Sequence, residues 1–493
     1  MLLLLLPSLA WRCGTSPRPP APLAAFAALP PPRLSCAPPR LSCAPPRHSC
    51  APPRLSNAPP RLPCASPAHR ARTITASERP DADGDESGAS MVQSSFNLVK
   101  NVAGAGVLSL PAGVAAGTGL APALAVLLAL GVYSAYTFTL LGRLCAETGQ
   151  SSFKGLGEAT IGPRFGAMMD ATCTLKTFFT CLAYSLVLAD SSSAILAAAG
   201  APALLAARPS ALLLITLGAL LPLCLLKQLA VLSYTSLLGV GALAYTTAFM
   251  VTRLLDGSYA AGGVYYALLA AELRPSWGGR GIWHVSMKSV VLACSLSTAF
   301  IAHYNAPKFY ASLRRASAER FSRVSAASFG VAIALFTAVT CAGYLTFGSA
   351  SQGLILNNYA TCDPLATAAR VAIASSIVFT YPLAFTGLRD GVQSLFRVPE
   401  SARLQLTSAL LATVTALALV VRDVGFVNNL GGSIFGALII YIFPGRLFLA
   451  ARRAQGVRSF EQLFAKITIG AGVLLAVLGS AVTILKQYTR LLG

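Results

Sequence analysis

Residues 96–111, FNLVKNVAGAGVLSLP, carry the residue types in this chain best suited to binding a small charged molecule. Gly104 and Gly106 lie inside an apolar segment, where a glycine costs a helix about 1 kcal/mol relative to alanine. A helix that unwinds there presents N–H groups at the start of one half and carbonyl groups at the end of the other. These groups suit an anion and a cation lying side by side. The alternative is a face of small residues that packs against another helix.

The composition indicates the environment of this segment. The chain has 493 residues, of which 55% are hydrophobic and 11% are charged, and its mean hydropathy is +0.65. Such a balance predicts an all-α, polytopic membrane protein embedded in a lipid bilayer. The net charge of +21 is spread over short loops and the N-terminal tail, so no nucleic-acid partner is expected.

Eleven apolar segments after residue 90 are each long enough to span about 30 Å of hydrocarbon. With the N-terminus in the cytoplasm, the inside loops carry 17 Lys and Arg and the outside loops carry six. This asymmetry satisfies the positive-inside rule and places the C-terminus outside. The expected spans are residues 92–116, 120–142, 171–198, 209–226, 229–252, 283–304, 322–346, 364–388, 404–421, 425–449 and 465–488.

Residues 1–90 are expected to form a disordered tail that packs against nothing, ahead of a transmembrane domain at 91–493. A seven-residue unit close to APPRLSC recurs between Arg33 and Arg61, and such a proline-rich repeat has no apolar face to bury. Nine arginines and no acidic residue precede residue 78, which is typical of a transit peptide, and the initial MLLLLLPSLA resembles the apolar region of a signal peptide. A cytosolic tail or a misassigned start codon remains an alternative. The target membrane is therefore open: plasma membrane, vacuole or other endomembrane, or plastid envelope.

A second interrupted segment lies five spans after the first. Residues 297–313, STAFIAHYNAPKFYASL, carry His303, Asn305 and Pro307 where a plain span would stay apolar. Interrupted segments at matching positions in two halves of a chain indicate a transporter binding site. The alternative is that these residues mark only the end of the sixth helix.

Five motifs in this order resemble the amino acid/auxin permease family. They are FNLVKNVAGAGVLSLP, FIAHYNAPKFYASL, GYLTFG at 343–348, TYPLAFTGLRD at 380–390 and LGGSIFGALIIYIFPGRLFL at 430–449. The similarity covers residues 91–493 and is nearest to the sodium-coupled neutral amino acid transporters. It implies a five-plus-five inverted-repeat fold of the leucine-transporter type, in which helices 1 and 6 are discontinuous and an eleventh helix is added.

The resemblance also implies a substrate site at the two breaks. The N–H groups of Ala105 and Gly106 would bind a substrate carboxylate. The carbonyls of Val102 and of the break near Phe300 would bind its ammonium, and Phe300 and His303 would line the side-chain pocket. The residues implied in substrate binding are Val102, Ala103, Gly104, Ala105, Gly106, Phe300 and His303.

A site for a coupling ion, H⁺ or Na⁺, is expected beside the first break. Lys100 and Asn101 lie near the position where sodium-coupled members of the family place an asparagine ligand, and Ser376 and Thr380 share one face of the eighth helix. The ammonium of Lys100 would occupy the cation position itself. The alternatives are a lysine that reaches the cytoplasmic surface and hydroxyls that bond carbonyls of their own helix.

The remaining charged residues near or within spans are Lys176, Asp190 and Arg370. We expect structural pairing, as of Arg370 with an acid of a neighbouring helix, and a role in gating is the alternative. No HExxH, P-loop or CxxC motif is present, so neither an enzyme, a metal site nor a cofactor is expected. The sequence therefore predicts a monomeric secondary active transporter for amino acids. The alternative is a receptor of the same fold that senses amino acids with little transport.

Overall fold

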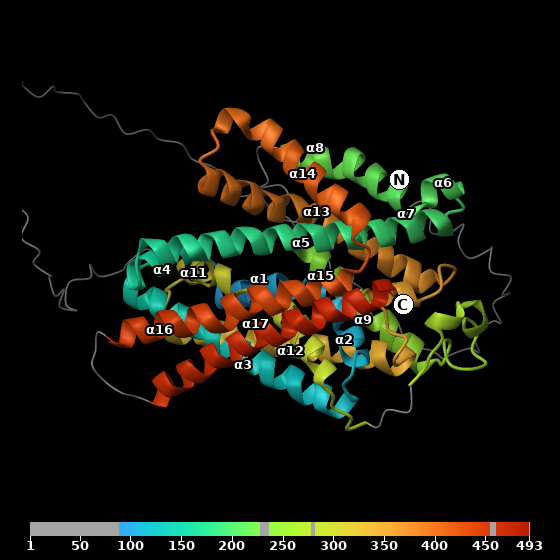
Figure 1. Ribbon diagram of the computed structural model, residues 1–493, viewed down its shortest axis with the longest axis horizontal. Helices are drawn as coiled ribbons and strands as arrows, with labels where there is room; N and C mark the ends of the chain where they lie inside the picture. The colour runs from blue at the N-terminus through green and yellow to red at the C-terminus, as the bar shows by residue number, and fades with distance from the viewer. Residues whose placement is uncertain (1–87, 227–235, 278–281, 454–459, 493) are drawn as a thin grey trace, which may run out of the picture. The chain divides into compact units, whose positions relative to one another are not determined.

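The computed structural model describes residues 88–226, 236–277, 282–453 and 460–492, which form a bundle of helices (Figure 1). In this part of the chain ten helices are long and apolar enough to cross a membrane, and a bent pair at the N-terminal end makes an eleventh span. The eleven expected spans are therefore present.

Two of the spans are interrupted at mid-length, as the sequence predicts. The first consists of α1 (Met91–Val102), the 3-10 helix η2 (Ala105–Ser109) and α2 (Leu110–Ala115). The sixth consists of α10 (Val290–Ala299), the 3-10 helix η8 (His303–Asn305) and α11 (Ala306–Ser312). The others are α3 (Leu120–Thr148), α5 (Pro163–Ala198), α7 to α8 (Arg208–Leu225), α9 (Ser236–Leu255), α12 (Ala318–Phe347), α13 (Pro364–Phe396), α14 (Arg403–Val420), α15 to α16 (Val424–Arg453) and α17 (Phe460–Leu492).

Helix α5 occupies the middle of the bundle. It packs against α13, α14 and α7 on one side and against α15 on the other. Helix α12 packs against α1, α3 and α9, while α17 lies against the tenth span and α10. Short α4 (Phe153–Thr160) and α6 (Ala203–Ala206) cap the two ends of α5. The two broken spans thus lie inside a frame of continuous helices.

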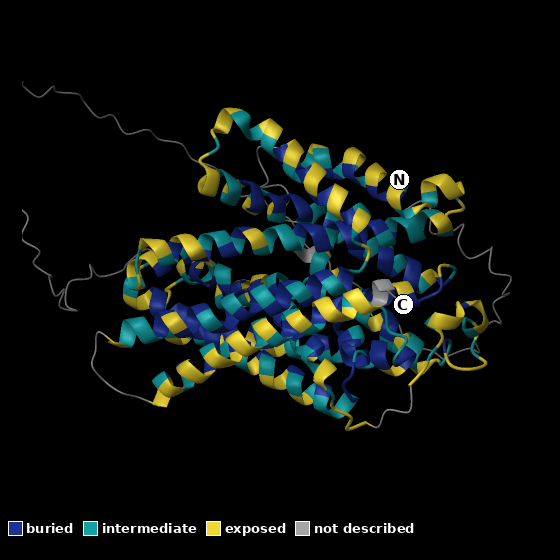
Figure 2. Ribbon diagram, viewed as in Figure 1, coloured by how far each residue is buried: buried dark blue, intermediate teal, exposed yellow. Residues whose placement is uncertain are grey.

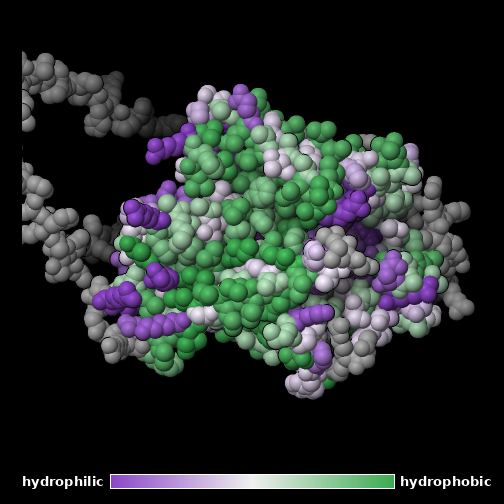
Figure 3. Space-filling view, viewed as in Figure 1, coloured by the Kyte–Doolittle hydropathy of each residue, from purple (hydrophilic) through white to green (hydrophobic). Residues whose placement is uncertain are grey.

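The outer faces of the bundle are apolar. Val132 on α3, Val420 on α14 and Val477 on α17 are 56%, 80% and 62% exposed, and Figure 2 shows exposed residues along the outer helices. Figure 3 shows hydrophobic side chains over the middle of the visible face and hydrophilic ones toward its two ends. An exposed apolar belt between polar ends is the surface that a lipid bilayer covers. The protein is therefore an integral, multi-pass membrane protein.

The structure differs from the sequence predictions in local details. The tenth span contains an eleven-residue π-helix, η11 (Gly432–Ile442), and the fourth contains a shorter one, η3 (Thr216–Leu220). Such wide turns are frequent at functional sites, but apolar periodicity does not reveal them. The glycines of the first span predict that residues 101–107 are non-helical and that the helix resumes near Leu108. In the structure Asn101 and Val102 are still helical, and only Ala103 and Gly104 lie outside a helix.

The end of the N-terminal tail corrects the expectation that it packs against nothing. The N–H of Ala89 donates to the carbonyl of Ser312 at 2.9 Å, and the N–H of Arg314 donates to the carbonyl of Ala89 at 3.0 Å. The hydroxyl of Ser90 caps α1 by accepting the N–H of Gln93 at 3.2 Å. Residues 88–90 therefore belong with the helices, while the arginine repeat and the rest of the predicted tail lie outside the described residues.

Candidate functional site

The break in the first span exposes backbone donors. The chain bends by 44° between α1 and the segment that begins at Gly106. The N–H of Ala103 bonds Val99, and that of Gly104 bonds the carbonyl of Val102 at 2.9 Å. Ala105 and Gly106 then begin a 3-10 helix, whose first N–H groups have no acceptor within the helix. Within the described part of the chain, these N–H groups are the donors that the break presents at mid-span, while the carbonyl of Val102 already accepts one hydrogen bond.

The break in the sixth span exposes backbone acceptors. Helix α10 ends at Ala299, and Phe300 closes it by donating its N–H to Leu296 at 2.9 Å. Among the described residues, no group donates to the carbonyls of Thr298 and Ala299. These carbonyls carry the partial negative charge of a helix C-terminus. This break can therefore bind a cation, as the first can bind an anion.

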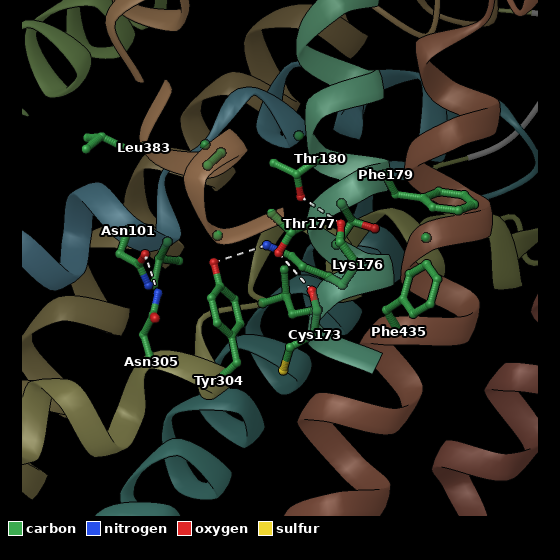
Figure 4. Close-up of a pocket in the computed structure, with 18 of the residues that line it drawn as sticks. Asn101, Cys173, Lys176, Thr177, Phe179, Thr180, Tyr304, Asn305, Leu383 and Phe435 are labelled. Carbon is green, nitrogen blue, oxygen red and sulfur yellow. Dashed lines mark hydrogen bonds between the residues drawn. The ribbon is translucent and has the colours of Figure 1, made fainter. Parts of the chain in front are cut away.

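The two breaks lie beside one another. A Cβ atom built on Gly106 would be 3.5 Å from Cγ2 of Thr298 and 3.9 Å from Cα of Ala299. The side-chain amide of Asn305 donates to the side-chain oxygen of Asn101 at 3.1 Å (Figure 4). The amide nitrogen of Asn101 is buried and has no hydrogen-bond partner among the described residues. Donors and acceptors for a zwitterion thus converge on one place.

A cavity of about 1300 Å³ contains both breaks. It reaches Gln93 and Asn97 at the beginning of α1 and Asp390 near the end of α13, and all three side chains are exposed. Its lining at depth includes Val102, Gly104, Gly106, Thr298, Ala299, Tyr304, Phe179, Thr180, Tyr184, Asn428 and Phe435. The positive-inside rule predicts that the beginning of α1 faces the cytoplasm, and with that topology the cavity would open toward the inside.

A second, smaller cavity of about 300 Å³ lies beyond the breaks, toward the other side. Ser109 and Asn429 line it, whereas the neighbouring Asn428 lines the large cavity. The side-chain amide of Asn428 donates to Oγ of Ser109 at 3.3 Å, and Oγ of Ser109 donates to the carbonyl of Gly106 at 2.7 Å. A thin layer of hydrogen-bonded residues therefore separates the two cavities.

Phe300 and His303 do not line the large cavity, which corrects the expectation that they form its side-chain pocket. Both are fully buried. Phe300 packs against Phe336 with ring centroids 4.9 Å apart. His303 Nε2 lies 2.9 Å from Oγ1 of Thr137 and 3.0 Å from the carbonyl of Ser134, both on α3. Phe300 therefore packs against α12, and His303 forms its hydrogen bonds with α3. The sequence alone does not show in which direction these two side chains point.

Lys100 and Thr380 line the cavity. A Cβ atom built on Gly239 of α9 would be 3.8 Å from Cε of Lys100 and 3.2 Å from Oγ of Ser376. The lysine is thus directed toward α9 and α13 rather than back along α1. The hydroxyl of Thr380 donates to the carbonyl of Ser376 at 2.8 Å, so its proton stays within α13 and its lone pairs remain available to a cation.

A contact between two side chains that line the cavity, Lys176 and Tyr304, was not predicted from the sequence. Nζ of Lys176 on α5 donates to the hydroxyl of Tyr304 at 3.1 Å and lies 4.4 Å from the centroid of its ring (Figure 4). Within the described residues, no carboxylate forms an ion pair with Lys176, so the expected structural pairing is wrong. A lysine in the middle of a span is by itself a signal of function, and that signal could have found it.

Asp190 and Arg370 lie away from the cavity. Asp190 pairs with Arg208 at 2.6 Å, as expected of a structural charge. Arg370 instead donates to backbone carbonyls, at 2.8 Å to Leu356 and at 2.6 Å to Tyr359. The expectation that Arg370 pairs with an acid of a neighbouring helix is wrong, because the loop before α13 supplies enough carbonyl oxygens.

Comparison with known proteins identifies the family. The family described as "Transmembrane amino acid transporter protein" matches residues 87–485, so the chain belongs to it. The chain is 27% identical to "Putative sodium-coupled neutral amino acid transporter 11" of Danio rerio, over 80% of this chain and 87% of that protein. It is 26% identical to "Solute carrier family 38 member 8" of Homo sapiens, over 73% and 85% of the two chains.

Solved structures confirm the fold. The inward-facing conformation of Mhp1 superposes with a TM-score of 0.50 at 12% identity, over 83% of this chain and 95% of that one. The closed conformation of Mhp1, a nucleobase-cation-symport-1 family transporter, gives a TM-score of 0.51 at 10% identity, over 81% and 91%. The chain therefore has the five-plus-five inverted-repeat fold, and its relatives are named as transporters rather than as enzymes or receptors.

Proposed function

We propose that this protein is a secondary active transporter that moves amino acids across its membrane by alternating access around the two breaks. The observation that carries the proposal is their juxtaposition within one cavity. The free N–H groups of Ala105 and Gly106 suit a carboxylate, and the free carbonyls of Thr298 and Ala299 suit an ammonium. An α-amino acid carries both groups on one carbon.

The layer between the two cavities supports alternating access. The site is reached from the inside, and the hydrogen bonds between Ser109, Asn428 and Gly106 close it from the outside. In the proposed cycle these bonds break as the inner mouth closes around the substrate. Only a few polar contacts then have to change, and they can re-form with water on the open side.

We further propose that the coupling ion is H⁺ and that Lys100 carries it. An ammonium about 4 Å from an oxygen cage between the first and eighth spans would repel Na⁺ by about 4 kcal/mol at an effective dielectric of about 20. This corresponds to about a thousandfold in affinity. The direction of Lys100 toward Ser376 supports this assignment, whereas the names of the sodium-coupled relatives favour Na⁺.

The test is uptake of a panel of labelled amino acids by the purified protein reconstituted in liposomes, with a pH gradient, a sodium gradient or neither. We expect accumulation of at least one amino acid, driven by the pH gradient. The Lys100→Asn variant should lose the pH dependence and gain sodium dependence, while Lys466→Asn on the exposed face of α17 should behave as wild type. Sodium-driven, pH-independent uptake by the wild type would refute the role of Lys100. The absence of any uptake would refute transport.

A further inference from the structure

The ammonium of Lys176 lies in the large cavity without an acidic partner. Tyr304 supplies one hydroxyl acceptor at 3.1 Å and the face of its ring at 4.4 Å. An ammonium has three donors, so at least two of them remain available on the cavity side. A cation within a membrane span is costly unless it meets a counter-charge or water. The described part of the protein offers Lys176 no counter-charge.

The charges around the cavity are unbalanced. Among the described residues that line it are four lysines, at 100, 154, 176 and 308, and two aspartates, at 170 and 390. Asp170 pairs with Lys154 at 3.4 Å, and Asp390 lies 3.3 Å from its neighbour Arg389. Both acids are therefore already engaged by other cations. A cleft of one charge sign with low-dielectric walls attracts ligands of the opposite charge.

Lys176 lines the cavity beside the two breaks. Tyr304 belongs to the 3-10 helix η8 that follows the break in the sixth span, and the next residue, Asn305, bonds Asn101 of the first span at 3.1 Å. Along α5, Thr180 lies one turn beyond Lys176, about 6 Å away, and also lines the cavity. Figure 4 shows Lys176 directed from α5 toward Tyr304, between the two breaks and Phe435.

We propose that Lys176 is a specificity-determining residue that receives a side-chain carboxylate, so that the protein takes acidic amino acids in preference to neutral and cationic ones. This inference rests on the proposed transport of amino acids and names the substrate class. The backbone groups at the breaks hold the α-carboxylate and the α-ammonium. Lys176 adds a third contact that only an acidic side chain can use, and the excess of lysines repels a cationic one.

The test compares L-glutamate with L-glutamine, which differ only in carboxylate against carboxamide. Equilibrium binding of each labelled amino acid is measured on the purified full-length protein. We expect the wild type to bind glutamate at least about tenfold more tightly than glutamine, as the loss of one charged contact predicts. Lys176→Gln should weaken glutamate binding by about tenfold or more and change glutamine binding by less than about threefold.

Two further variants control for charge and folding. Lys176→Arg keeps the charge and should retain the preference for glutamate. Arg323→Gln removes one positive charge at an exposed side chain outside the cavity and should leave the ratio of the two affinities within about threefold. Thermal unfolding of each variant shows whether it is folded, and the wild-type ratio tests the proposal even where Lys176→Gln does not fold.

The binding measurements test the role of Lys176 separately from the proposed transport function. Wild-type protein that binds glutamine, or any neutral amino acid, as tightly as glutamate overturns the role of Lys176. If Lys176→Gln lowers the affinities for glutamate and glutamine by the same factor, the proposal is also overturned. The lysine would then hold the α-carboxylate that all amino acids share. If no amino acid of the uptake panel binds at all, the proposed function itself fails, and the inference fails with it.

Discussion

The side-chain amide of Asn305 donates a hydrogen bond to the side-chain oxygen of Asn101 at 3.1 Å, and this bond joins the two broken spans. Asn101 lies three residues before Gly104 in the first span, and Asn305 lies six residues after Ala299 in the sixth. Because both half-helices must keep their mutual position to present donors and acceptors together, the pair is a positioning contact for the site.

Loss of the contact between Asn101 and Asn305 should weaken substrate binding. A hydrogen bond of this kind contributes about 1 kcal/mol, so Asn305→Ala should lower the affinity for the transported amino acid by about fivefold. Asn357→Ala is the matched control, because Asn357 bonds Asp190 at 2.9 Å at an exposed position. Equilibrium binding measures both variants. Equal affinities in wild type and Asn305→Ala would show that the pair does not position the site.

A buried ion pair on the outer side should dominate the stability of the loop before α13. Asp363 is fully buried and binds Arg253 at 2.7 Å and the hydroxyl of Tyr259 at 3.0 Å. Asp363→Ala leaves the cation of Arg253 without this partner, and we expect a loss of about 3–5 kcal/mol of unfolding free energy.

The control for this prediction is an exposed ion pair. Glu319 and Arg323 lie 2.5 Å apart with side chains 75% and 68% exposed, so Glu319→Ala should cost less than about 1 kcal/mol. Thermal unfolding in detergent measures both variants. If Asp363→Ala lowers the midpoint of thermal unfolding no more than Glu319→Ala does, the pair of Asp363 and Arg253 does not determine stability.

The close approach of the sixth and tenth spans requires a glycine at position 432. A Cβ atom there would lie 1.9 Å from the carbonyl oxygen of Cys294 and 2.6 Å from Oγ1 of Thr298. Gly432→Ala must push η11 away from α10, at a cost of about 1–3 kcal/mol, and it displaces the acceptor end of the site.

The matched control is Gly218→Ala, because a Cβ atom on Gly218 meets nothing within 4 Å. Thermal unfolding and substrate affinity should both fall in Gly432→Ala and stay at wild-type values in Gly218→Ala. A Gly432→Ala variant as stable and as active as wild type would show that the two spans separate freely.

The sequence predicted the spans and the two breaks because their signals are local. Apolar length sets the spans, and Gly104, Gly106 and Pro307 mark where regular hydrogen bonding ends. Val102, Gly104, Gly106 and the backbone beside Phe300 therefore lie together as the family resemblance implied. Their role in binding stays a prediction.

Side-chain directions could not be predicted in the same way. Phe300 and His303 turn toward α3 and α12, and Lys176 turns toward Tyr304 across 128 residues of sequence. Each direction depends on which helix packs opposite, and span counting does not contain this information. The π-helix of the tenth span was missed for a similar reason, because its apolar residues fit an ordinary helix equally well.

The central claim is that substrate binds at the paired breaks, and Gly104 offers the cleanest way to block them. A Cβ atom on Gly104 meets nothing within 4 Å, and the residue lines the large cavity. Gly104→Leu therefore introduces a side chain whose Cβ atom clashes with nothing, and we expect this side chain to occupy the site. A Cβ atom on Gly330, on the exposed face of α12, likewise meets nothing within 4 Å, so Gly330→Leu is the matched control.

The measurement is the initial rate of labelled amino acid uptake by liposomes that contain either variant or the wild type, each with its thermal midpoint as a check on folding. We predict that Gly104→Leu lowers uptake by about tenfold or more at an unchanged midpoint, and that Gly330→Leu stays within about twofold of wild type. Uptake by Gly104→Leu at the wild-type rate and apparent affinity would contradict the account, because the substrate would then bind elsewhere.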